Sequence, residues 1–230
     1  MRKLILFFSL LVLFGCQNKQ AKLNIPPSKN AVSYLALGDS YTIGEQVEQE
    51  QRWPVQLAAA LNEKGIPMED PLIIAKTGWT TDELMNAIIA ADLKKTFDYV
   101  SLLIGVNNQY RGRSVENFEE EFIELLDKAI EFSGNQAENV FVLSIPDWGV
   151  TPFASTRNRA QIGAEIDAYN AVIEKQCRQR DIAFFNITPI SRLAVNTPEL
   201  LATDGLHPSG LMYSRWVTTV LPFFNTPSNE

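Results

Sequence analysis

The sequence predicts an α/β protein, a three-layer α/β/α sandwich built around a central, mostly parallel, five-stranded sheet. Two observations support this fold class. Over residues 32–226, short apolar runs alternate about five times with long amphipathic stretches, and such alternation is typical of parallel β–α units. The chain of 230 residues is 46% hydrophobic and 20% charged, a composition typical of folded proteins. Because no internal repeat or second domain is evident, we expect one domain over residues 32–226.

Five apolar runs are the expected strands. Each run is continuous rather than alternating, which is typical of strands that helices cover on both faces. The runs are residues 33–38, 71–76, 97–105, 138–146 and 182–187.

Amphipathic stretches between these runs are the expected helices, at residues 53–65, 80–93, 114–134, 160–181 and 209–224. The first has Pro54 in its first turn and Gly65 at its end, in agreement with the usual positions of these residues. Thr80 or Thr81 caps the second helix. Residues 114–134 carry an apolar stripe from Phe118 to Ala129 on one face.

The first residues, MRKLILFFSLLVLFGC, have the features of an export signal. Arg2 and Lys3 precede an apolar run that ends at residue 14, too short for a bilayer, which requires about 20 residues. The LFGC at its end resembles the lipobox of bacterial lipoproteins. We therefore expect residues 1–15 to be removed, Cys16 to carry a lipid, and residues 16–31 to form a polar tether. The alternative is an ordinary secretory signal that is cut nearby.

This interpretation places the protein in a bacterial cell envelope, lipid-anchored and facing the periplasm or the exterior. The formal net charge of −7 and the isoelectric point near 4.9 argue against nucleic-acid binding, which requires clustered basic residues. The sequence has no histidine and cysteine cluster, so we expect no metal and no cofactor. Cys177 is expected to be a buried or half-buried apolar residue. We expect a monomer.

The loops that follow the strands contain the candidate chemistry, because a parallel sheet places its working groups at the carboxyl ends of its strands. Ser40 follows the first strand in GDSYTIG, and His207, the only histidine, lies three residues after Asp204 in DGLHP. That spacing lets the carboxylate reach one imidazole nitrogen while the other faces a serine, as in a catalytic triad. Each residue also has a simpler explanation as a turn or capping residue.

Two further loops contain candidate hydrogen-bond donors for an oxyanion. Asn107 follows the third strand and Gly78 the second. The Asn107 side chain and the backbone N–H groups of Gly78 and Ser40 are suitable donors. Glycine and asparagine after strands are, however, usually turn formers.

Four segments in this order resemble those of the SGNH or GDSL hydrolases: GDS at 38–40, Gly78, GVNN at 105–108 and DGLH at 204–207. The resemblance extends over essentially the whole domain and implies a flavodoxin-like SGNH hydrolase fold. It implies Ser40 as nucleophile, His207 as base and Asp204 as the residue that orients it, with Ser40, Gly78 and Asn107 as the oxyanion hole. Asn108 departs from the family, which usually has aspartate there, and we expect activity to survive.

The resemblance implies a carboxylic ester hydrolase. The expected substrate is a small ester of one of three classes: a lipid such as a lysophospholipid, an acyl thioester, or an O-acetylated sugar. Tyr41, Trp79, Tyr110 and Trp148 lie beside the motifs and are candidate substrate contacts. The alternative is a catalytically inactive SGNH-like surface lipoprotein that binds a glycan or a protein partner.

Overall fold

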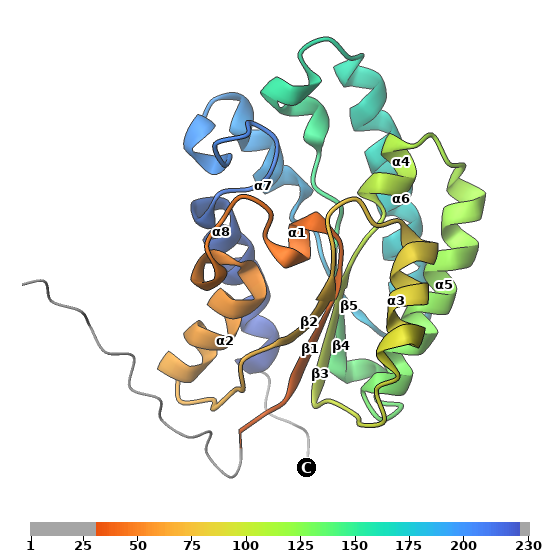
Figure 1. Ribbon diagram of the computed structural model, residues 1–230, viewed down its shortest axis with the longest axis vertical. Coiled ribbons are helices and arrows are strands. Elements are labelled where there is room, and N and C mark those ends of the chain that lie inside the picture. Colours follow the sequence, from red (N-terminus) through yellow and green to blue (C-terminus); the bar gives the residue numbers. More distant parts are fainter. Residues whose placement is uncertain (1–30, 226–230) are drawn as a thin grey trace, which may run out of the picture.

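The computed structural model describes residues 31–225 and contains a five-stranded sheet between two layers of helices (Figure 1). The strands are β1 (Tyr34–Gly38), β2 (Leu72–Ala75), β3 (Tyr99–Leu103), β4 (Val140–Leu143) and β5 (Ala183–Phe185). Their order is β2-β1-β3-β4-β5, and each adjacent pair is parallel. The predicted fold class is confirmed, and among these strands the sheet is wholly parallel.

The apolar runs form the centre of the sheet. β1 and β4 are buried along their whole length, as are four of the five residues of β3. Ser101, a buried polar residue of β3, is satisfied by a 2.7 Å hydrogen bond with the Tyr34 hydroxyl. β1 ends at the predicted residue, and the other strand ends lie one to three residues inside the predicted runs, because the flanking residues turn into the adjoining loops.

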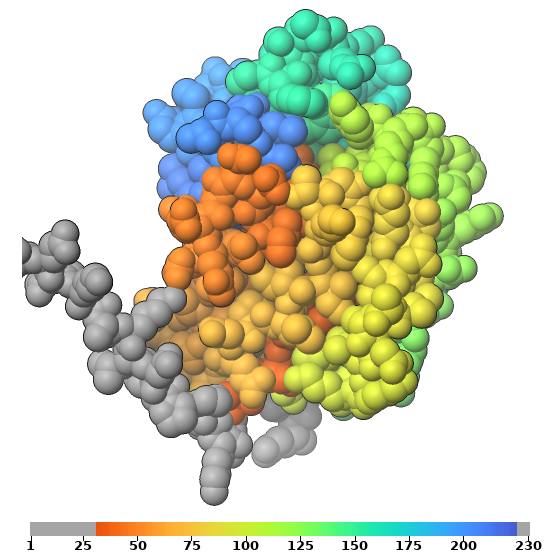
Figure 2. Space-filling view, viewed as in Figure 1, coloured from red at the N-terminus to blue at the C-terminus, as the bar shows by residue number. Residues whose placement is uncertain are grey.

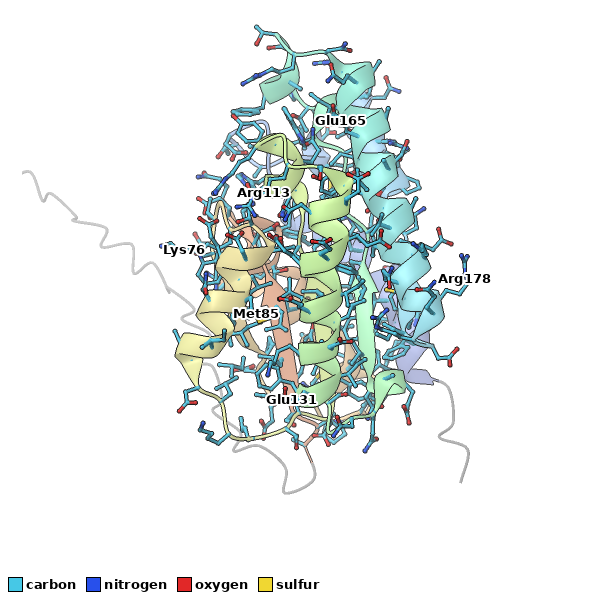
Figure 3. All side chains as sticks on the ribbon, turned by 90° about the vertical axis from the view of Figure 1, so that its right-hand side faces the viewer. Lys76, Met85, Arg113, Glu131, Glu165 and Arg178 are labelled. Carbon is cyan, nitrogen blue, oxygen red and sulfur yellow. The ribbon has the colours of Figure 1, made fainter. Side chains whose placement is uncertain are left out.

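One face of the sheet is covered by α2 (Trp53–Glu63) and α8 (Gly210–Val220), and the other by α3 (Thr81–Ala91), α5 (Val115–Phe132) and α6 (Arg159–Gln179) (Figures 1 and 3). These five helices were predicted. In the space-filling view only small red areas of β1 are visible between the orange and yellow atoms of neighbouring segments (Figure 2).

Local sequence signals explain where the helices begin. Thr80 is the N-cap of α3, and its backbone N–H donates to the Glu83 carboxylate at 2.9 Å in a capping box. Ser114 caps α5 and Ser209 caps α8. The predicted last helix ends at Val220 and continues as a 3₁₀ turn, η7 (Leu221–Asn225).

Three short helices were not predicted, and each follows the carboxyl end of a strand: α1 (Ser40–Ile43), α4 (Val106–Tyr110) and α7 (Thr188–Arg192). The loop after β4 contains two 3₁₀ turns, η3 (Trp148–Val150) and η4 (Pro152–Ala154). The other 3₁₀ turns are η1 (Gln49–Gln51), η2 (Ala137–Asn139), η5 (Leu193–Val195) and η6 (Pro198–Leu200). A helix of one turn leaves no repeating apolar pattern in the sequence.

Both ends of the described chain lie at the amino edge of the sheet. β1 begins there, and Phe224 near the C-terminal end packs its ring 4.7 Å from that of Tyr99, the first residue of β3. Within residues 31–225, no helix has the length and apolar character that a bilayer crossing requires. The predicted signal peptide, the predicted lipidation site Cys16 and nearly all of the predicted tether lie outside the described residues.

Candidate active site

The sheet topology creates a crevice at the carboxyl end of β1. The chain leaves β1 toward β2 on one side, and β3 lies on the other side of β1, so the loops after β1 and β3 diverge above this point. Ser40 begins α1 directly after β1, and Asn107 lies in α4 after β3. Gly38 permits this close approach, because a Cβ there would lie 2.2 Å from Thr42 Oγ1 and 2.4 Å from the Leu103 carbonyl.

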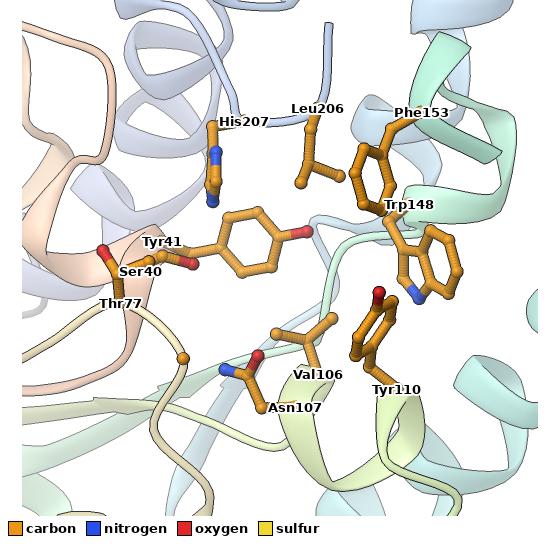
Figure 4. A pocket seen from close by; sticks show the side chains of 11 residues that line it. Ser40, Tyr41, Thr77, Val106, Asn107, Tyr110, Trp148, Phe153, Leu206 and His207 are labelled. Atoms are coloured by element: carbon orange, nitrogen blue, oxygen red, sulfur yellow. The ribbon is translucent and has the colours of Figure 1, made fainter. Parts of the chain in front are cut away.

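A cavity of about 210 Å³ occupies this crevice. Ser40, Gly78, Asn107 and His207 all line it, although they come from four separate segments. In Figure 4 His207 lies above Ser40 and Asn107 below it. The structure therefore brings together the predicted nucleophile, the predicted base and the predicted oxyanion donors.

The loop before α8 holds His207 by its contacts with Asp204. His207 Nδ1 lies 2.6 Å from Asp204 Oδ2, and the backbone N–H groups of Leu206 and His207 each donate to Asp204 Oδ1 at 3.0 Å. Gly205, with φ +65°, makes this tight turn possible. Partial burial acts to raise the pKa of Asp204, but the hydrogen bonds from His207 and Leu206 outweigh it and hold the pKa below its usual range. Asp204 is thus an anion that fixes the imidazole orientation and leaves Nε2 for the cavity.

Hydrogen bonds support the two segments that contain the predicted oxyanion donors Asn107 and Gly78. Asn107 Nδ2 donates one hydrogen to the Trp79 carbonyl at 2.9 Å, and an amide nitrogen has a second hydrogen to give. The Gly78 carbonyl accepts from Arg111 Nη2 at 2.7 Å, and the same guanidinium pairs with Glu83 at 3.1 Å. Arg111 therefore supports the Gly78 loop.

Asn108 is buried beneath this loop. Its Oδ1 accepts from the Thr81 backbone N–H at 3.1 Å, its Nδ2 donates to Thr81 Oγ1 at 2.6 Å, and Nδ2 lies 3.4 Å from Glu121 Oε2. Arg113 bridges Asp82 at 2.7 Å and Glu121 at 3.3 Å between α3 and α5 (Figure 3). The hydrogen bond from Arg113 lowers the pKa of Asp82 to about 2. The Asn108 amide, where the family usually has aspartate, thus lies next to the Glu121 carboxylate, which also pairs with Arg113.

Asp39 is fully buried directly before Ser40. Its Oδ1 accepts the Tyr41 backbone N–H at 3.0 Å as the N-cap of α1, while Oδ2 has no hydrogen-bond partner among the described residues. Burial raises the pKa of Asp39 to about 7. Its position in a turn motif suggested a cap, but only the packing reveals the burial.

The end of the cavity away from Ser40 is apolar and aromatic (Figure 4). Tyr110 and Trp148 approach within 5.3 Å and Trp148 and Phe153 within 6.0 Å between ring centroids. Trp148 Nε1 donates to Gln109 Oε1 at 2.7 Å, which fixes the orientation of the indole. We call Tyr110, Trp148 and Phe153 the aromatic wall.

Three of the four predicted substrate contacts, Tyr41, Tyr110 and Trp148, line the cavity. Trp79 does not; its side chain packs against the core and only its carbonyl supports the site. Thr77, Val106, Phe153 and Leu206 also line the cavity. No group of three His, Cys, Asp or Glu side chains within residues 31–225 is placed to hold a metal ion.

Comparison with known proteins gives a consistent result. The sequence profile of the GDSL-like lipase/acylhydrolase family matches residues 36–215. A search among curated proteins finds no match. Solved structures with similar folds include TesA, with 17% identity, a TM-score of 0.66 and coverage of 84% of this chain and 97% of the other. A lipase/acylhydrolase from Enterococcus faecalis has 19% identity, a TM-score of 0.66 and coverage of 86% and 100%. Axe2, an acetylxylan esterase from Geobacillus stearothermophilus, has 15% identity, a TM-score of 0.66 and coverage of 85% and 94%.

Proposed function

Because the chain belongs to the GDSL-like lipase/acylhydrolase family, and is a carboxylic ester hydrolase, we propose that Ser40, His207 and Asp204 are its catalytic triad. The observation that carries this proposal is the 2.6 Å contact between His207 Nδ1 and Asp204 Oδ2 beside a cavity that Ser40 also lines. The cavity is mostly apolar beyond these groups, and exclusion of water strengthens the electrostatic interactions that stabilise charge in the transition state.

The reaction proceeds through an acyl-enzyme. Ser40 Oγ attacks the ester carbonyl while His207 Nε2 takes the hydroxyl proton, and Asp204 stabilises the resulting imidazolium. The backbone N–H groups of Ser40 and Gly78 and the free Nδ2 hydrogen of Asn107 donate to the oxyanion. His207 then protonates the leaving alcohol. Water repeats the sequence, releases the carboxylic acid and restores Ser40.

The test compares Ser40→Ala and His207→Ala with Ser214→Ala in hydrolysis of 4-nitrophenyl acetate. We expect the first two variants to lower kcat by a factor of about 10³ or more. The Ser214 hydroxyl on α8 donates to the Leu211 carbonyl of its own helix at 2.8 Å, so its variant controls for the loss of a hydroxyl. Circular dichroism verifies that each variant folds. Near-normal turnover by Ser40→Ala would contradict the assignment.

The rival function is an inactive SGNH-like module that binds a glycan or a protein partner. A fluorophosphonate probe separates the two, because it reacts only with a serine that an adjacent base activates. We expect labelling of the wild-type protein and none of Ser40→Ala. Folded wild-type protein that resists the probe would support the binding module.

We also propose that Cys16 carries a lipid that anchors the enzyme in a bacterial cell envelope. The support is the LFGC sequence at the end of the apolar run. In cells fed a clickable fatty acid, the wild-type protein should become labelled and sediment with membranes, whereas Cys16→Ser should do neither. An unlabelled wild-type protein would favour an ordinary secretory signal.

A further inference from the structure

A second pocket, of about 310 Å³, adjoins the catalytic cavity at the aromatic wall. Tyr110 and Trp148 line both spaces. The remaining lining is polar or charged except for one isoleucine and one glycine: Gln109, Gly112, Arg157, Asn158, Gln161, Ile162 and Glu165. We propose that this pocket is a subsite for a sugar ring in the leaving-alcohol part of the substrate, which makes the substrate an esterified glycan. This proposal rests on the proposed function and specifies its substrate class.

The polar side chains of the subsite are held in place before any ligand binds. Trp148 Nε1 donates to Gln109, Gln109 Nε2 donates to Glu165 at 2.6 Å, and Gln161 Nε2 donates to the other Glu165 oxygen at 2.8 Å. This chain of hydrogen bonds connects the aromatic wall to the start of α6. Preorganised polar groups lose little conformational entropy when they bind a ligand.

Arg157 adds an available cation at the rim. Its Cζ lies 6.0 Å from the centre of the Tyr110 ring, and its guanidinium has no ion pair with any residue between 31 and 225. The pocket therefore presents guanidinium donors, amide groups and a carboxylate together.

This mixture matches the chemistry of hydroxyl groups. A hydroxyl both donates and accepts, so a ring with several of them can use the Arg157 donors and the Glu165 acceptors at once. A phosphate group has only acceptor oxygens and a negative charge, and the Glu165 carboxylate would repel it. The exposed faces of Tyr110 and Phe153, each 48% accessible, are suited to pack against the C–H face of a sugar ring.

The path from the nucleophile to the subsite fits such a substrate. The scissile ester would lie at Ser40 in the catalytic cavity, and its sugar part would extend over Tyr110 and Phe153 toward Arg157. A long acyl chain requires continuous apolar surface, and the lining becomes polar immediately beyond the aromatic wall.

The experiment measures selectivity in Arg157→Ala and Gln161→Ala. The matched control is Arg178→Ala, which removes the same charge from an exposed position near the other end of α6 (Figure 3). Each protein is assayed with acetylated xylotetraose, 4-nitrophenyl acetate and lysophosphatidylcholine. We expect the kcat/KM ratio of xylotetraose acetate to 4-nitrophenyl acetate to fall by about tenfold in the two subsite variants. Arg178→Ala should retain the wild-type ratio.

An equilibrium measurement tests binding apart from turnover. Calorimetric titration of Ser40→Ala with unacetylated xylotetraose, cellotetraose and chitotetraose should reveal binding of at least one, and addition of Arg157→Ala should weaken it by about tenfold. Binding of none of the three, or an unchanged ratio in the subsite variants, would overturn the subsite. A loss confined to lysophosphatidylcholine would replace the sugar with a phosphate headgroup. Turnover by Ser40→Ala would instead refute the proposed function.

Discussion

Asp39 should make the protein less stable as the pH rises toward neutrality. Its pKa is about 7 in the folded protein, and burial is the main cause, against an ordinary value of about 3.9. A carboxyl group whose folded pKa is raised favours the folded state fully below the unfolded pKa, and this contribution is lost as the pH rises through the folded pKa. The affected range therefore extends from about pH 4 to about pH 7.

The size of the effect follows from the shift of about three pKa units. Each unit corresponds to about 1.4 kcal/mol, so ionisation of Asp39 removes about 4 kcal/mol from the free energy of unfolding across this range. Asp39→Asn cannot ionise, yet it retains an oxygen for the Tyr41 backbone N–H. Its unpaired amide costs about 1–3 kcal/mol at every pH. The variant should therefore lose stability at pH 4 and recover, relative to the wild type, by pH 8.

The assay is urea denaturation followed by tryptophan fluorescence at constant ionic strength between pH 4 and pH 8. The quantity of interest is the free energy of unfolding of Asp39→Asn minus that of the wild type, because other carboxylates cancel in this difference. We expect the difference to rise by about 4 kcal/mol over the range. Asp181→Asn, which removes an exposed carboxylate, is the control and should give a nearly constant difference. A constant difference for Asp39→Asn would refute the reasoning.

Three further predictions test residues outside the proposed triad. Asn108→Asp should lower the free energy of unfolding by about 1–3 kcal/mol in urea titrations, because a second carboxylate would face Glu121 across 3.4 Å. Addition of Glu121→Gln to this variant should restore most of the lost stability. A double variant without recovery would argue against this charge repulsion. Gly38→Ala should lower the melting temperature by 10 °C or more and abolish ester hydrolysis, since its Cβ would overlap Thr42 and the Leu103 carbonyl. A normal melting temperature would show that the turn can shift. Burial raises the pKa of Cys177 to about 12, so in a chain that begins at residue 25 this thiol should react with a disulfide reagent only after unfolding, and rapid labelling of the native protein would contradict that burial.

The strands could be predicted because their signal is local. Continuous apolar runs such as residues 33–38 remain buried wherever they lie in a parallel sheet. The end of β3 could not be predicted in the same way. Gly105 has φ +123°, and a Cβ there would lie 2.7 Å from Phe118 and 2.8 Å from Ile145, so tertiary packing decides where the strand stops and α4 begins.

The candidate site likewise combines contacts that follow from local sequence with contacts that depend on tertiary packing. Asp204 and His207 are three residues apart, so their contact follows from one short turn. The contribution of Phe153 to the cavity depends on a contact between two distant loops, where its backbone N–H donates to the Gly205 carbonyl at 3.3 Å. The burial of Asp39 likewise depends on packing that the motif GDS does not specify. Sequence patterns predicted the candidate reactive groups, whereas the shape of the space around them required the fold.

The position of both described chain ends at the amino edge of the sheet has a practical consequence. The catalytic cavity opens at the opposite, carboxyl edge, so a bead, a carrier protein or a sensor surface joined to either end would leave the cavity mouth open. Enzyme immobilised through the residue just before β1 and enzyme immobilised through the end of η7 should therefore hydrolyse bulky, polymer-bound esters equally well. Attachment through surface lysines in random orientations should yield a fraction of molecules whose cavities face the support.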